Sequence, residues 1–144
     1  MTVRVPLVVL VVWVAMSAGA CTVEEIAFAA GTRPVDAYEL DPEVMPAQAR
    51  ELVTLESEDG VTLSALWAEA DEPVGLTVLF CHGVAQNLDD TLPRLERLRE
   101  LGFDLLAVDY RGFGTSEGKA SEEGLYRDAE AAWRHVVDVR GRDP

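Results

Sequence analysis

The chain has 144 residues, and its 26 Asp and Glu outnumber its 12 Lys and Arg, which gives a formal net charge of −14 at pH 7. That length allows one domain with its own hydrophobic core. A protein this acidic lacks the positive surface with which proteins bind nucleic acid, so we expect no nucleic-acid partner.

The amino-terminal stretch predicts a secretory signal peptide over residues 1–20. Arg4 is its single charge, Val5–Ala15 is apolar apart from Pro6, and small residues follow up to Ala20. A positive start, a short apolar run and a small-residue exit define such peptides, whereas a membrane-spanning helix needs about 20 apolar residues. An uncleaved anchor helix is the alternative. Both readings imply export to the cell envelope.

Cys21 follows these small residues directly. The stretch Ala18-Gly19-Ala20-Cys21 resembles the lipobox of bacterial lipoproteins, in which the cysteine carries the lipid and becomes the mature amino terminus. The resemblance implies a lipid anchor at Cys21 that holds the protein on a membrane; ordinary cleavage near Ala20 is the alternative. With Cys21 lipidated, Cys81 has no intramolecular partner, so we expect no disulfide scaffold.

Residues 21–47 contain glycine and several prolines without clear periodicity, which predicts a tether. A domain over residues 48–144 follows. It opens with two runs of alternating polarity, Glu51–Ser57 and Val61–Trp67, on either side of the turn Asp59-Gly60. Two such runs around an Asp-Gly turn predict a β-hairpin.

The hydrophobic pattern then changes. The almost continuously apolar run Val74–Cys81 predicts a strand buried on both faces. Leucines spaced by three or four between Leu88 and Leu101 predict a helix. Thr91 is its expected N-cap, and Gly102 is expected to end it.

A second apolar run, Phe103–Val108, is closed by Asp109, and a glycine-rich loop over residues 110–118 follows. Ser121 is the expected N-cap of a last helix. The order is therefore hairpin, strand, helix, strand, helix. Strands that alternate with helices predict an α/β fold with parallel strands covered on both sides.

Two segments carry a resemblance to a known family. The first is LFCHGVAQN at residues 79–87, and the second is AVDYRGFGTSEG at residues 107–118. Both resemble the α/β-hydrolase superfamily, in particular its serine aminopeptidase-like and its esterase- or lysophospholipase-like members. The resemblance covers residues 50–144. It implies the N-terminal portion of an α/β-hydrolase sheet, truncated before the nucleophile elbow.

The first segment implies one half of an oxyanion hole. In acyl transfer, the negative charge that develops on the substrate oxygen needs fixed hydrogen-bond donors. In this fold one donor is a backbone N–H in the loop after the third strand. At the matching position that donor is Val84, in the loop that begins with His82 and Gly83. The resemblance implies a structural role for His82, and Gly83 would let the chain turn sharply at the strand end.

The second segment matches the G-x-S-x-G pattern of a nucleophile elbow at Ser116, but such an elbow is a sharp strand-to-helix turn. Ser116 lies on a loop, so we interpret it as structural. Asp109 is expected to hydrogen-bond loop amides or to pair with Arg111. The resemblance places the nucleophile, the catalytic acid and the catalytic His beyond residue 144. We therefore expect no catalytic residue within the chain, and a fragment that is inactive and poorly soluble on its own.

No spacing of His, Cys and acidic residues suggests a metal site, and no glycine loop of nucleotide-binding form is present, so no cofactor is expected. His135 is interpreted as a surface residue of the last helix. The resemblance implies hydrolysis of ester, thioester or amide bonds in a small acyl-type or peptide substrate. The alternative is a catalytically inactive hydrolase-fold fragment or a binding module.

Overall fold

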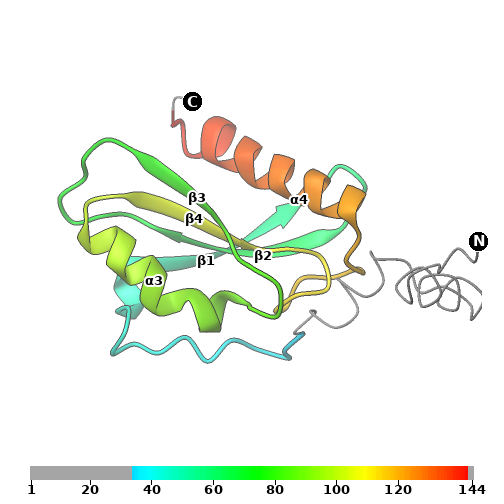
Figure 1. Ribbon diagram of the computed structural model, residues 1–144. Helices are drawn as coiled ribbons and strands as arrows, with labels where there is room; N and C mark the ends of the chain where they lie inside the picture. The colour runs from blue at the N-terminus through cyan, green and yellow to red at the C-terminus, as the bar shows by residue number, and fades with distance from the viewer. Residues whose placement is uncertain (1–33, 143–144) are drawn as a thin grey trace, which may run out of the picture.

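A computed structural model describes residues 34–142, which form a single mixed sheet with a helix on each face (Figure 1). The predicted signal peptide and Cys21 lie outside the described residues. Within the described part, no helix is long and apolar enough to cross a membrane. In their order across the sheet, the strands are β1 (Arg50–Glu56), β2 (Thr62–Ala68), β4 (Asp104–Asp109) and β3 (Thr77–Cys81).

The first two strands form the predicted hairpin. They pair antiparallel with Val53 opposite Ala65. The turn between them contains Gly60 at a φ of 80°, a conformation that glycine adopts without steric cost. The hairpin joins the rest of the sheet because β2 also pairs antiparallel with β4, with Leu66 opposite Ala107.

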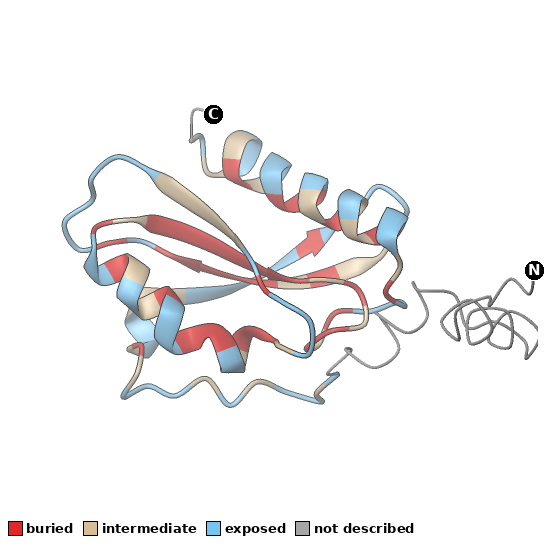
Figure 2. Cartoon of the chain, viewed as in Figure 1, coloured by how far each residue is buried: buried red, intermediate tan, exposed pale blue. Residues whose placement is uncertain are grey.

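The parallel pair is formed by β3 and β4, with Leu79 opposite Leu106. Every residue of β4 is buried, whereas β3 is only partly buried (Figure 2). The prediction of a strand buried on both faces is therefore wrong for the run Val74–Cys81. Among the described residues β3 pairs with β4 on one side only, so its other side lies at the edge of the sheet.

Two helices cover the sheet on opposite faces, as the α/β pattern predicts (Figure 1). The helix α3 (Leu88–Glu100) buries its leucines against one face. The helix α4 (Glu122–Arg134) covers the other and continues into a π-helical turn, η2 (His135–Val139). Ser121 caps α4 as predicted, because its hydroxyl accepts the Gly124 N–H at 3.1 Å.

The start of α3 differs from the prediction. Its N-cap is Asn87 rather than Thr91, so the helix begins one turn earlier. The Asn87 side chain accepts the Asp90 N–H at 3.1 Å, and the Asp90 carboxylate accepts the Asn87 N–H at 3.2 Å. This reciprocal capping box satisfies two amides that the helix cannot pair by itself. The predicted end is confirmed, since Gly102 follows the last turn at a φ of 92°.

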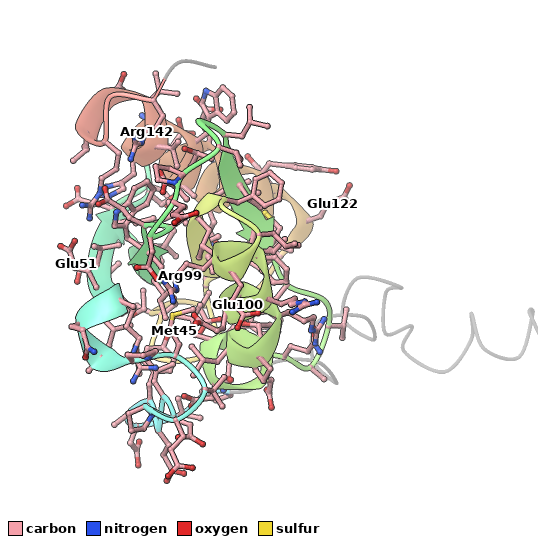
Figure 3. All side chains as sticks on the ribbon, turned by 90° about the vertical axis from the view of Figure 1, so that its left-hand side faces the viewer. Met45, Glu51, Arg99, Glu100, Glu122 and Arg142 are labelled. Carbon is pink, nitrogen blue, oxygen red and sulfur yellow. The ribbon has the colours of Figure 1, made fainter. Side chains whose placement is uncertain are left out.

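Residues 34–49, hereafter the strap, run along the α3 side of the sheet before β1 (Figure 1). The strap ends in a short 3-10 turn, η1 (Ala47–Ala49). Met45 is fully buried in the core beneath α3, and Figure 3 shows it between η1 and that helix. Part of the segment predicted as a tether therefore packs against the domain.

Candidate oxyanion site

The carboxyl ends of β3 and β4 lie at the same edge of the sheet because the two strands are parallel. Open α/β sheets bind their ligands at this edge. Two segments leave it: residues 82–87, hereafter the oxyanion loop, connect β3 to α3, and residues 110–118, hereafter the glycine loop, follow β4. Both segments that carry the family resemblance therefore meet at one place in the fold.

Val84 is 63% exposed, whereas the first and last residues of the oxyanion loop, His82 and Asn87, are buried. Among residues 34–142, no group accepts its N–H. The next residue, Ala85, has a φ of 59°, and it is the one residue other than glycine with a positive φ in the described chain. An L-residue in this conformation is strained by about 1 kcal/mol or more, and such strain gathers at functional sites.

Gly83 does not make the sharp turn that the sequence suggested for it. Its φ lies outside the positive region, and a Cβ there would meet only the Gln86 side-chain oxygen, at 3.5 Å. The reversal of the chain takes place at Ala85 instead. Sequence reasoning missed this residue because alanine gives no signal for a positive φ.

Asp109, at the end of β4, is fully buried beneath the oxyanion loop. Its Oδ2 accepts the Leu88 N–H at 3.3 Å and the Tyr38 hydroxyl at 2.7 Å. Its Oδ1 lies 3.2 Å from His82 Nε2. Asp109 thus accepts one amide, but that amide is the first of α3 and not a loop amide as expected, and the alternative pairing with Arg111 is not formed.

His82 is 8% exposed, which leaves its ring little contact with solvent. Its edges pack on Tyr110 and Phe113, each with a centroid distance of 5.1 Å. Nδ1 lies 2.8 Å from the Gly83 carbonyl oxygen. Nε2 is within ion-pair distance of Asp109, but the alignment of the two groups falls short of a hydrogen bond. Enclosed in this way, the ring supports the loop, in agreement with the structural role that the resemblance implies.

Ser116 lies in the glycine loop, which turns back along β2 before α4 begins. Its hydroxyl donates to the Asp109 carbonyl oxygen at 2.6 Å and accepts the Ser64 N–H at 2.9 Å. A nucleophilic serine instead needs a base to take its proton. The contacts of Ser116 join β2 and β4 to the glycine loop, which agrees with its interpretation as structural.

Arg111 anchors the glycine loop to α4 and to the hairpin turn. Its guanidinium pairs with Asp128 and with Asp59, each at 2.7 Å, and Asp128 is fully buried. Hydrogen bonds from Arg111, followed by those from Arg127, hold the pKa of Asp59 well below its usual range. Sequence analysis missed this network because its members are far apart in the chain and belong to no motif.

Two further side chains, Trp67 of β2 and His135, lie away from this edge. Trp67 is buried under the guanidinium groups of Arg140 and Arg142, whose carbons lie 4.8 and 5.7 Å from its ring centroid. His135 is half-buried and accepts the Arg140 Nε–H at 3.2 Å, so it is not a plain surface residue. Residues 34–142 contain no group of acidic, His and Cys side chains that could hold a metal ion.

The hairpin, the parallel pair with helices on both faces and the strained loop at the carboxyl edge define the first part of an α/β-hydrolase domain. Comparison with known proteins agrees. The family model for serine aminopeptidase, S33, matches residues 72–144. Since that match covers half of the chain, the chain belongs to this family of α/β-hydrolases.

Three similar proteins illustrate the relationship. The chain is 38% identical over 77 residues to a multifunctional-autoprocessing repeats-in-toxin of Vibrio cholerae, covering 53% of the chain and 2% of the toxin. It is 38% identical over 101 residues to the uncharacterized protein YfhR of Salmonella typhi, covering 65% of the chain and 34% of YfhR. The esterase Pf2001 of Pyrococcus furiosus superposes with a TM-score of 0.62 at 25% identity, over 75% of this chain and 40% of the esterase.

Proposed function

We propose that the chain forms the oxyanion side of a serine hydrolase that cleaves ester, thioester or amide bonds in small acyl-type or peptide substrates. Family membership supports hydrolysis as the reaction class. The observation that carries the proposal is the exposed Val84, with its unused backbone N–H, beside the strained Ala85 at the carboxyl edge of the sheet. A donor held rigid before the substrate arrives is what stabilises an oxyanion.

The chemistry follows from that placement. A serine oxygen attacks the substrate carbonyl, a histidine takes the serine proton, and the carbonyl oxygen becomes negative within reach of the Val84 N–H. Collapse of this intermediate expels the alcohol, thiol or amine, which takes the proton from the histidine, and water then releases the acyl group. We place the serine, the acid and the histidine in a part of the enzyme other than residues 1–144. The second oxyanion donor, the amide after the nucleophile, belongs to the same part.

We also propose that the protein acts at the cell envelope. The predicted signal peptide over residues 1–20 and the lipobox-like Cys21 support this location. Replacing Cys21 with Ala is expected to release the protein from the membrane fraction and to abolish labelling with a clickable palmitate analogue. Unchanged fractionation without lipid labelling would instead favour the uncleaved anchor helix.

The test of the hydrolase uses the native gene product, isolated from its own cells with an antibody against residues 34–142. We expect it to react with a fluorophosphonate probe and to hydrolyse p-nitrophenyl butyrate. Val84→Pro, which removes the N–H, is expected to lower kcat by about 100-fold or more with little change in KM. Val84→Ala, which keeps the N–H, is the control.

A catalytically inactive fragment or binding module is the competing function. It would be supported if the isolated protein neither reacted with the fluorophosphonate probe nor hydrolysed the ester.

A further inference from the structure

One carboxylate contacts both ends of the oxyanion loop. Asp109 Oδ1 lies 3.2 Å from Nε2 of His82, the first residue of the loop. Oδ2 accepts, at 3.3 Å, the N–H of Leu88, the residue that follows the loop and begins α3. Because the two oxygens of a carboxylate are a fixed distance apart, rotation of the Asp109 side chain would move one end of the loop relative to the other.

The contact that fixes this rotation comes from the strap. The Tyr38 hydroxyl donates to Asp109 Oδ2 at 2.7 Å and accepts the Thr115 N–H at 3.2 Å. Burial, followed by the negative charge of Asp109, raises the pKa of Tyr38 to about 12. The phenol therefore remains a protonated donor throughout the physiological range of pH.

Tyr38 is itself held in place by its neighbours along the strap. The Glu39 N–H donates to Asp89 Oδ1, in the first turn of α3, at 3.0 Å. The Val35 N–H donates to the Gly114 carbonyl oxygen at 2.9 Å, and Met45 is fully buried beneath α3. The strap thus contacts the glycine loop, Asp109 and the first turn of α3.

We propose that Tyr38 is a positioning residue of the oxyanion site: through Asp109 it sets the geometry of residues 82–87 and so the direction of the Val84 N–H. The strap is thereby part of the site, and its release from the domain loosens the oxyanion loop. The effect of Tyr38 on the loop is inferred from these contacts alone, whereas its effect on catalysis rests on the proposed function.

The first experiment needs no activity. Tyr38→Phe keeps the ring and removes the hydrogen bond, and amide hydrogen exchange is followed in the isolated native protein by mass spectrometry with fragmentation to single residues. The hydrogen bond that is lost goes to a charged carboxylate, so we expect the exchange rate of the Leu88 amide to rise about tenfold. Exchange across β4 should stay unchanged. The control is Tyr126→Phe, since Tyr126 also donates to a carboxylate, Glu122 at 2.9 Å, but on the exposed surface of α4.

Two outcomes would overturn the positioning role. One is unchanged exchange at Leu88, and the other is an equal rise at Leu88 and across β4, which would mean that Tyr38 contributes only to global stability.

The second experiment measures ester hydrolysis by the isolated native protein that carries Tyr38→Phe. We expect kcat to fall about tenfold with KM unchanged, because the donor is misdirected in the transition state while substrate binding persists. An unchanged kcat would contradict the effect on catalysis. If the native protein without substitutions hydrolyses no ester, the proposed function fails, and hydrogen exchange alone still decides whether Tyr38 positions the loop.

Discussion

At the scale of single residues, the tightest point of the site is Gly114. Its φ is 51°, and a Cβ built on it would lie 1.8 Å from Asp109 Oδ2 and 2.5 Å from the Tyr38 hydroxyl oxygen. The glycine loop can therefore approach the buried carboxylate of Asp109 only because residue 114 has no side chain. The pattern G-x-S-x-G at this position reflects close packing beside Asp109.

Gly114→Ala is expected to lower the free energy of unfolding by about 3 kcal/mol or more, because the new methyl group must displace Asp109 or Tyr38 and also adopts a strained φ. Denaturant unfolding of the full chain measures the change. Gly60→Ala is the matched control: its φ of 80° is also positive, but nothing lies within 4 Å of the new Cβ. That control should cost about 1 kcal/mol, and an equal loss in both variants would argue against the packing explanation.

Arg111 is the second residue on which the site depends. Arg111→Met leaves the fully buried Asp128 without its cation. Removing one partner of a buried pair typically costs about 3 kcal/mol or more, and we expect a loss of that size in urea unfolding. Arg127→Met, which removes exposed pairs with Asp59 and Glu58, should change stability little. Comparable losses in the two variants would contradict the importance of burial.

At the scale of elements, the end of α4 changes from α-helical to π-helical geometry. In η2 the Arg140 N–H donates to the His135 carbonyl oxygen at 3.0 Å, five residues back. The wider turn places Arg140 over Trp67, where its guanidinium also pairs with Glu51 of β1 at 2.9 Å. Figure 3 shows Arg142 and Glu51 on this same side of the molecule. The turn therefore joins the carboxyl end of α4 to the hairpin.

This junction is expected to weaken in acid. Burial, followed by the positive charge of Arg140, lowers the pKa of His135, while Glu51 opposes the shift. The unfolded chain then binds a proton more readily than the folded chain, so the stability contributed by neutral His135 is present above about pH 6.5 and is lost as the pH falls through that region. His135→Gln keeps an acceptor for Arg140 but cannot titrate.

The measurement compares the free energy of unfolding at pH 7.5 and pH 5.5 in the wild-type chain and in His135→Gln. The wild-type chain should lose more stability between the two values. Equal losses would mean that His135 does not contribute to the acid sensitivity.

At the scale of the whole molecule, the two edges of the sheet differ in charge. The edge strand β1 carries Arg50, Glu51 and Glu56. Around the other edge strand, β3, residues 73–87 contain no Asp, Glu, Lys or Arg. Natural sheets protect exposed edges with charges, and an uncharged apolar edge recruits other strands. Within the described residues, β3 is therefore the surface most prone to association.

Leu76→Lys is expected to reduce aggregation of the 144-residue chain severalfold, because it places a charge on a 62% exposed side chain next to β3. Static light scattering over a range of protein concentrations checks this outcome. Leu52→Lys, at a 53% exposed position on β1, adds the same charge at the other edge and should have a smaller effect. Equal effects would attribute the aggregation to net charge rather than to the β3 edge.

A feature of the fold could be predicted when the residues that determine it lie close together in the sequence. The alternating runs around Asp59-Gly60, the leucine spacing of α3 and the cap at Ser121 are local, so the hairpin, both helices and the α/β class could be predicted from sequence. The N-cap of α3 is Asn87 and not the predicted Thr91, because Asn87 and Asp90 form reciprocal hydrogen bonds that cap the helix one turn earlier. The π-helical turn at His135 has no local signal, since it is stabilised by contacts with Trp67 and Glu51.

For the site, short motifs at the ends of strands were enough to predict a loop at residues 82–87, the placement of Ser116 on a loop and the resemblance to the α/β-hydrolase superfamily. Which side chains meet at the site depends on the packing of the folded chain. That packing paired Asp109 with His82 and Tyr38 instead of Arg111, and it placed the strained turn at Ala85 instead of Gly83. Such contacts join residues far apart in the chain, 77 positions in the case of Tyr38 and Thr115, and packing of the folded chain alone selects them.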